Sequence, residues 1–156
     1  MEIILTENEL FQAAIIGIQR RLESLRNHRV GKAGQPTDQL WRDNIEGACG
    51  EAAVSKALNT FWLGEWDVFK TRKDVAKKYE VRTSAYASAH LILFPDDFDD
   101  APYILVTGSA PNYKMAGWLL GSDGKKNQYW GTRAGRSSYW IPQTNLHSMK
   151  DLLDAA

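Results

Sequence analysis

The chain has 156 residues and a formal net charge of zero, because 19 Lys and Arg balance 19 Asp and Glu. A protein that coats DNA non-specifically is normally basic. The charge balance excludes that class and leaves a local basic patch or a bound metal ion for any contact with nucleic acid. The composition, 44% hydrophobic and 24% charged, is that of a globular chain, and we expect one domain over residues 1–156.

The sequence lacks the features of secreted and membrane proteins. Its single cysteine, Cys49, cannot form a disulfide within the chain, and the apolar start at residues 1–5 is too short for a signal peptide. No apolar run reaches the roughly 18 residues that a membrane-spanning helix needs. We therefore expect a cytoplasmic protein with no membrane partner.

Two helices are predicted in the first 60 residues. Thr6, early acidic residues and apolar residues spaced three and four apart predict a helix over about residues 7–27. After a loop rich in Gly and basic residues, Asp38 is a suitable cap for a second helix over about residues 39–59. Gly47 and Gly50 lie in the middle of this helix, where each costs about 1 kcal/mol relative to Ala. We expect them where another backbone or a ligand comes close.

Short β-rich runs separated by turns follow after residue 63. They predict strands at residues 66–69, 79–83, 90–94, 103–107, 114–120 and 139–141, and residues 146–153 predict a short closing helix. This order of elements is typical of a mixed α/β (α+β) fold with a central mixed β-sheet flanked by helices. The alternation in residues 115–120 further predicts that Trp118 is buried.

Glu51 is the first candidate for a functional residue. It lies three and four residues after Ala48 and Gly47, on the side of the helix that carries small residues. A carboxylate on that side would face the sheet. The alternative is a Glu at the edge of this face that extends into water.

Asp74, Glu80 and Arg82 form the second candidate. On a strand, Glu80 and Arg82 point to the same face, and Asp74 lies just upstream on an incoming strand or turn. Mg²⁺ takes one or two carboxylates together with water and phosphate oxygens. Asp74, Glu80 and the Val81 carbonyl could therefore bind Mg²⁺ or Mn²⁺, with Glu51 arriving from the helix. The alternative is an ordinary solvated strand face.

This order of residues resembles the PD-(D/E)XK nuclease superfamily. That family has a Glu on its first core helix, an Asp at a strand start, and then Asp or Glu two residues before a Lys on the next strand. Gly50-Glu51, Asp74 and Glu80-Val81-Arg82 match this order within residues 38–94. Two later runs, residues 103–108 and 116–121, resemble the last part of small nuclease-like proteins of phages and mobile elements.

The resemblance implies a restriction-endonuclease-like core and a Mg²⁺-dependent deoxyribonuclease, with Glu51, Asp74, Glu80 and Arg82 as catalytic residues. The chain departs from the family in two places. Arg82 replaces the family's Lys and, being always protonated, cannot act as a general base, although it can stabilise a phosphate. The acidic stretch at residues 95–102 also reads as a turn where the family usually has a helix. The alternative function is therefore a catalytically degenerate module that binds nucleic acid or a protein partner.

Residues 121–136 are the third candidate, because cations alternate there with aromatic residues. Such a pattern suits phosphate contact and base stacking, and the alternative is a solvated hairpin. The residues expected to bind DNA are Lys125, Lys126, Trp130, Arg133 and Arg136. A second basic region, for which a solvated helix face is the favoured interpretation, comprises Arg20, Arg21, Arg26, Arg29 and Lys32. DNA is the expected partner, and a homodimer is left open.

Overall fold

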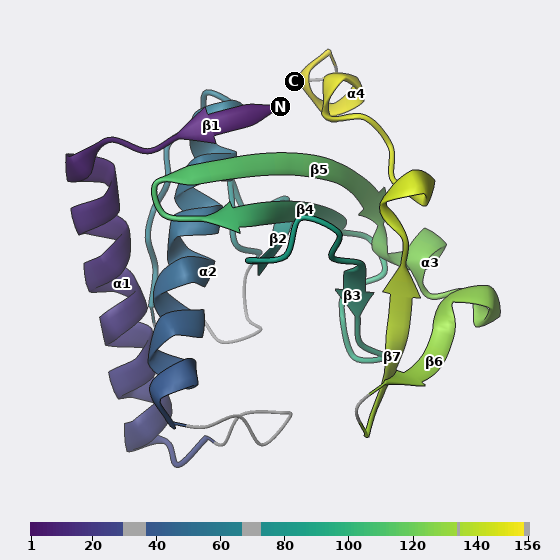
Figure 1. The fold of residues 1–156 in the computed structure, drawn as a ribbon, viewed down its shortest axis with the longest axis horizontal. Coiled ribbons are helices and arrows are strands. Elements are labelled where there is room, and N and C mark those ends of the chain that lie inside the picture. The colour runs from purple at the N-terminus through teal and green to yellow at the C-terminus, as the bar shows by residue number, and fades with distance from the viewer. Residues whose placement is uncertain (30–36, 67–72, 134, 155–156) are drawn as a thin grey trace.

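The computed structural model describes residues 1–29, 37–66, 73–133 and 135–154. A pair of helices, a four-stranded sheet and a three-stranded sheet are stacked in that order, with the helices on one face of the larger sheet (Figure 1). The expected α+β class is confirmed. Within the described residues, no helix is long and apolar enough to cross a membrane.

The helical layer consists of α1 (Glu7–Arg26) and α2 (Thr37–Ala57), close to the predicted bounds. Thr6 caps α1: its side chain accepts the Glu9 N–H at 3.3 Å, and the Glu9 carboxylate accepts the Thr6 N–H at 2.6 Å. A Cβ added to Gly17 would lie 2.5 Å from the Ile45 Cα, so only glycine allows α1 and α2 to pack this closely.

The larger sheet has the order β1 (Glu2–Ile4), β5 (Asn112–Leu120), β4 (Pro102–Ser109) and β2 (Glu80–Ser84). Strand β2 runs parallel to β4, while β1, β5 and β4 pair antiparallel, so the sheet is mixed, as predicted. Strand β2 is the last strand in this order, which leaves one of its edges open to the segment that contains Asp74.

The smaller sheet has the order β3 (Leu91–Leu93), β7 (Arg136–Ile141) and β6 (Trp130–Arg133), all antiparallel. Two short helices, α3 (Gly121–Gly124) and α4 (Met149–Leu153), and two 3₁₀ turns, Asn127–Tyr129 and Gln143–Asn145, complete the described elements. Strand β3 follows β2 in the chain and pairs with β7, so this segment lies beside the C-terminal part of the chain.

One hydrophobic core lies between the helices and the larger sheet, and a second lies between the two sheets. Successive side chains of β4 point alternately into one and the other. Ile104 and Val106 pack in the core under the helices, while Tyr103 and Leu105 pack in the core between the sheets. Since Val81 pairs with Ile104 and Arg82 with Leu105, the faces of β2 follow the same division. Glu80 and Arg82 therefore share the face of the sheet that looks toward the smaller sheet.

Several predicted elements need correction. Strands β1 and β6 were missed because they have only three and four residues and show no clear alternation. The strand expected at residues 66–69 falls mostly outside the described residues, and the closing helix begins only at Met149. Trp118 is half-buried rather than buried, since its ring packs beside His147 and its Nε1–H donates to the Ser148 carbonyl at 3.1 Å.

Candidate functional site

Glu51 is buried on the inner side of α2, with 6% of its side chain exposed. Arg20 of α1 binds both of its oxygens, at 2.5 Å and 2.8 Å, and the Trp62 Nε1–H donates to Oε2 at 3.2 Å. The same Arg20 also donates to the Glu65 carbonyl. The sequence prediction that Glu51 faces inward agrees with this placement, and the alternative of a Glu extending into water does not.

A close approach of α2 to β2 brings Glu51 near the strand. A Cβ added to Gly50 would overlap the Thr83 hydroxyl, so this position accepts only glycine without a shift of the neighbouring strand. The expectation for Gly50 agrees with the structure. Gly47 is different, because no atom lies within 4 Å of the position a Cβ would take, so this glycine marks no close contact with the described residues.

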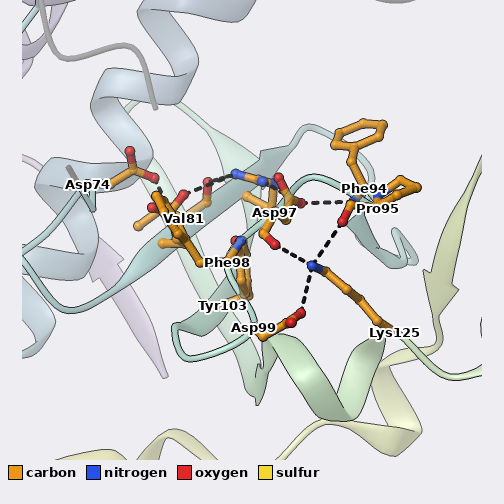
Figure 2. Close-up of polar contacts among 11 residues, drawn as sticks. Asp74, Val81, Phe94, Pro95, Asp97, Phe98, Asp99, Tyr103 and Lys125 are labelled. Carbon is orange, nitrogen blue, oxygen red and sulfur yellow. Dashed lines mark hydrogen bonds and ion pairs between the residues drawn. The ribbon is translucent and has the colours of Figure 1, made fainter. Parts of the chain in front are cut away.

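Asp74 lies at the open edge of β2, in the turn that leads to an isolated bridge between Val75 and Tyr79. Its Oδ2 accepts the Val81 N–H at 2.8 Å, a contact visible at the left of Figure 2. The backbone donor that would otherwise be unpaired at the sheet edge is thereby satisfied. Asp74 is thus held beside the strand that carries Glu80 and Arg82.

Arg82 connects the strand to the turn before β4. Its guanidinium donates to Asp97 Oδ2 at 2.8 Å, lies 3.6 Å from Glu80 Oε2, and stacks over the Tyr103 ring at 5.0 Å. Asp97 also accepts the Phe94 N–H at 2.9 Å (Figure 2). Asp97 therefore occupies one side of Arg82, and Glu80 lies beside the other.

Four carboxylates, those of Glu51, Asp74, Glu80 and Asp97, form what we call the acidic cluster. Among the described residues, Arg20 and Arg82 supply the compensating charge, Arg20 through Glu51 and Arg82 through Asp97 and Glu80. When these four carboxylates and two guanidinium groups are all ionised, their net charge is negative by two. A cluster with this imbalance favours the binding of a further cation or of protons.

The pKa values of the cluster reflect its burial and its charge imbalance. Burial, followed by the negative charge of Asp74, raises the pKa of Glu51 to about 7, although Arg20 and Trp62 act in the opposite direction. Burial and Asp74 also raise the pKa of Glu80 to about 8. Burial raises the pKa of Asp74 itself against the opposing hydrogen bond from Val81. Since Glu51 and Glu80 each respond to Asp74, the three predicted carboxylates interact electrostatically.

The chemistry of the acidic cluster fits a hard divalent cation, because its donors are carboxylate oxygens. Among the described residues, however, no three His, Cys, Asp or Glu side chains are placed to hold a metal ion together. A Mg²⁺ ion bound by one or two carboxylates, waters and substrate phosphate does not need such a set. The Val81 carbonyl, the third predicted ligand, accepts a 3.4 Å hydrogen bond from Arg82.

A cavity of about 490 Å³ lies between the two sheets, and Arg82 is part of its wall. Arg133 and Arg136, both predicted to bind nucleic acid, line the same cavity from β6 and β7. The remaining lining residues are Thr83, Ser84, Tyr86, Ser88, Ala89, His90, Ile92, Phe94, Leu105 and Trp140. We refer to this space as the inter-sheet cavity.

The other predicted nucleic-acid residues do not line this cavity. The Lys125 ammonium donates to the backbone carbonyls of Pro95 and Asp97 and lies 2.8 Å from Asp99 Oδ1 (Figure 2). Lys126 pairs with Asp123 at 3.2 Å. Trp130 is 47% exposed and contacts Tyr139 edge-to-face. Lys125 therefore fixes the acidic turn of residues 95–102, which in turn positions Asp97.

Three residues of the site were not selected from the sequence as site residues. Arg20 was grouped with a solvated helix face, Asp97 was one of several acids in a turn, and Trp62 carried no signal. Each contacts a predicted residue across the fold, Arg20 and Trp62 at Glu51 and Asp97 at Arg82. Among the predicted site residues, the acidic side chains, including Glu51 and Glu80, outnumber the cations. That imbalance is the signal that could have suggested further arginine partners.

The chain was compared with known protein families, curated proteins and solved structures. No family model, no curated protein and no solved structure matches the chain. The function must therefore be inferred from the site itself.

Proposed function

We propose that this protein is a Mg²⁺- or Mn²⁺-dependent DNA nuclease of the PD-(D/E)XK type that hydrolyses phosphodiester bonds. One observation carries the proposal: buried carboxylates from a helix, a turn and an edge strand interact with one another beside a cavity lined with arginines. A divalent cation would compensate the carboxylates, and the arginines would compensate the phosphates of DNA. The two parts together suit a substrate that is itself an anion.

In this proposal each residue of the site has a distinct role. Asp74 and Glu80, with the Val81 carbonyl, would hold the cation. When bound, that cation would neutralise charge on the scissile phosphate and make a water molecule easier to deprotonate. Glu51, fixed in orientation by Arg20, would position the attacking water. Arg82 would stabilise negative charge on the phosphate, which its permanent charge permits.

A second candidate is a module of the same fold that binds DNA or a protein without cutting. The observation that favours it is the pairing of the charged groups with one another, since Arg20 already binds both oxygens of Glu51 and Asp97 already binds Arg82. Such pairs lower the capacity of the cluster for a metal ion.

Metal-dependent cleavage distinguishes the two candidates. Supercoiled, linear, single-stranded and branched DNA would be incubated with the purified protein and Mg²⁺, Mn²⁺ or EDTA. We expect cleavage with either metal and none with EDTA. Asp74→Asn and Glu80→Gln should abolish cleavage at unchanged melting temperature, because both side chains keep their shape. Asp123→Asn, which removes an exposed acid of α3, is the matched control and should cut normally.

Arg82→Lys is the informative variant, because it restores the residue typical of the family. We expect cleavage to persist or rise, since a lysine keeps the positive charge at this position. Absence of metal-dependent cleavage on every DNA form, together with DNA or protein binding that survives Asp74→Asn, would replace the nuclease by the binding module.

A further inference from the structure

Three arginines of the described chain line the inter-sheet cavity, and one of them, Arg82, pairs with Asp97 and Glu80, which are not among the lining residues. Arg133 stacks over the Trp140 ring at 4.9 Å and Arg136 over the Phe94 ring at 4.1 Å, so aromatic faces rather than carboxylates hold these two guanidinium groups. None of the described residues that line the cavity is acidic. The Nε atoms of Arg82 and Arg136 are buried and have no hydrogen-bond partner in the described part of the chain. A buried N–H donor without an acceptor is unfavourable and is satisfied when an anion binds.

The guanidinium groups favour a phosphate among the common anions. Burial, followed by the positive charge of Arg82, lowers the pKa of Arg136, while the negative charge of Asp97 acts in the opposite direction. The two cations therefore repel each other, and Asp97 offsets part of that repulsion. A planar guanidinium binds phosphate oxygens through two parallel N–H donors, and a phosphate group can accept from several arginines at once. One phosphate would therefore satisfy the donors and remove the repulsion.

The rest of the wall suits a nucleobase. Trp140, Tyr86, Ile92 and Leu105 add aromatic and aliphatic surface, and His90, Ser84 and Ser88 add polar groups. The volume of about 490 Å³ lies within the range of about 300–1,000 Å³ typical of pockets for small molecules. A base that remains stacked and paired in a duplex cannot enter a space between two sheets, whereas an unpaired base can stack on an aromatic side chain.

We propose that the inter-sheet cavity binds one unpaired nucleotide of DNA, with its phosphate against Arg82, Arg133 and Arg136 and its base against the aromatic wall. The proposal rests on the proposed function only for the identity of the polymer as DNA. It assigns the nuclease a single-stranded segment or frayed end as substrate, because the acidic cluster lies beside the same strand, β2.

Binding of a mononucleotide in EDTA tests this site without cleavage. Thymidine monophosphate, thymidine and inorganic phosphate would be titrated separately, with calorimetry and tryptophan fluorescence as readouts. We expect the monophosphate to bind at least tenfold more tightly than either part alone. Arg136→Gln and Arg133→Gln should each weaken it about tenfold, and Arg26→Gln, which changes an exposed arginine of α1, should not. A short single strand should compete better than a blunt-ended hairpin of equal length.

The outcomes separate this inference from the proposed function. The nucleotide site would be overturned if the monophosphate failed to bind at millimolar concentration, if both cavity variants bound it as tightly as the wild type, or if phosphate alone bound as tightly as the monophosphate. If the protein cleaves DNA but binds no nucleotide, the proposal of a nucleotide site is wrong and the proposed nuclease function stands. Nucleotide binding without any metal-dependent cleavage would do the reverse. Arg133 is exposed, so its variant keeps the test valid even if Arg136→Gln disturbs the fold.

A second, independent observation concerns the outer face of α1. Five large apolar side chains spaced four, three, four and three residues apart are exposed there by 38–66%: Phe11, Ile15, Ile18, Leu22 and Leu25. The buried residues of α1 are instead Ala13, Gly17 and Arg21, and Leu10 and Ile16 pack against the core. In Figure 1, α1 lies on the outer side of the helical layer. The spacing is that of the apolar seam of a coiled coil, which fits another helix with the same spacing.

The charges of α1 identify a second copy of the chain as that helix. Glu7 lies in the first turn, and Arg26 lies in the last turn. An antiparallel arrangement of two copies brings acidic and basic ends together and opposes the helix dipoles favourably. It also gives the closed two-fold symmetry that is commonest among homo-oligomers. We infer that the protein forms an antiparallel homodimer through this seam.

Sedimentation equilibrium over a range of concentrations tests the dimer. The seam runs from Phe11 to Leu25, about 21 Å of helix. It is smaller than an interface of standard size, so we expect a concentration-dependent dimer rather than a permanent one. Ile18→Glu, at the centre of the seam, should give a monomer. Ile4→Glu, which makes the same change at an exposed isoleucine of β1, should leave the dimer intact. A wild-type monomer at every concentration, or a dimer that survives Ile18→Glu, would overturn the inference.

Discussion

The two flanks of strand β2 hold opposite charge imbalances within a short distance of each other. On the side of α2 and the open edge, Glu51 and Asp74 add carboxylates to a cluster that has too few cations. On the side of the smaller sheet, Arg133 and Arg136 add guanidinium groups to a cavity that no acid lines in the described part of the chain. Arg82 belongs to both, since it binds Asp97 and lines the cavity.

The difference shows how one edge strand can serve two steps of binding. Opposite charges could have been paired directly across the strand, which would satisfy both groups and leave nothing for a ligand. They are paired only in part, since Arg20 binds Glu51 and Arg82 binds Asp97 beside Glu80. Among the described residues, Asp74 on one flank forms no ion pair with Arg133 or Arg136 on the other, so each flank keeps a charge that a ligand of the opposite sign can balance. A divalent cation on one flank and a phosphate on the other would together complete the charge balance, and a DNA strand bound with Mg²⁺ supplies both.

The largest expected effect concerns the ion pair that holds the acidic flank. Arg20→Met leaves Glu51 buried without its cation, and breaking such a pair from one side costs about 3–5 kcal/mol. Arg26→Met is the matched control on the same helix, because the Arg26 side chain is 70% exposed and its pair with Glu23 contributes at most about 1 kcal/mol. Urea unfolding of both variants measures the difference. Equal losses would show that Glu51 does not depend on Arg20.

The pH dependence of stability should also distinguish the acidic flank. The pKa of Glu51 is raised from 4.5 to about 7, so between these values the folded protein binds more protons than the unfolded chain. The contribution of Glu51 to the free energy of unfolding must then fall as the pH rises from about 4.5 to about 7, and Glu80, whose pKa is raised to about 8, extends the decrease to about that pH. For Glu51 alone the decrease is about 3 kcal/mol. In urea titrations at several pH values, Glu51→Gln should make the decrease smaller by about this amount, while Glu80 and Asp74 keep their own share, and Asp123→Asn should leave the decrease unchanged. A slope that is unchanged in Glu51→Gln would contradict the assignment.

The sequence predicted the features that depend on local periodicity. Helical spacing placed Glu51 on the inner side of α2, and strand alternation placed Glu80 and Arg82 on one face of β2. Both follow from the geometry of a single element, which repeats every few residues. The α+β class could be predicted for the same reason, because each element carries its own pattern.

Contacts between distant elements could not be predicted in this way. Arg20 and Glu51 are 31 residues apart, and Arg82 and Asp97 are 15 apart, and no local pattern distinguishes these residues from their neighbours. Asp97 is one of four Asp in a turn, and only the position of β2 makes it the partner of Arg82. The same holds for Lys125 and Arg136, which are both cations near aromatic residues. The smaller sheet directs Arg136 to the cavity, while the acidic turn binds Lys125.

The smallest expected effect concerns how α2 approaches β2 and so separates the two flanks. Gly47→Ala and Gly50→Ala make the same change one helical turn apart. At Gly47 a Cβ meets nothing within 4 Å, so alanine should stabilise the protein by about 0.5–1 kcal/mol through its higher helix propensity. At Gly50 a Cβ would overlap the Thr83 hydroxyl, and the strand must shift at a cost of about 1–3 kcal/mol.

A double-mutant cycle decides whether that contact is the cause. Thr83→Ala removes the hydroxyl that the new methyl group would meet, so Gly50→Ala should cost less in this background than in the wild type. Urea unfolding gives the coupling energy, which should be at least about 0.5 kcal/mol. Because Thr83 adjoins Arg82, the single Gly50→Ala variant should also lose more cleavage than its stability alone explains, and Thr83→Ala should restore part of it. Additive effects of the two changes would mean that the helix does not set the position of β2, and the separation of the flanks would then need another explanation.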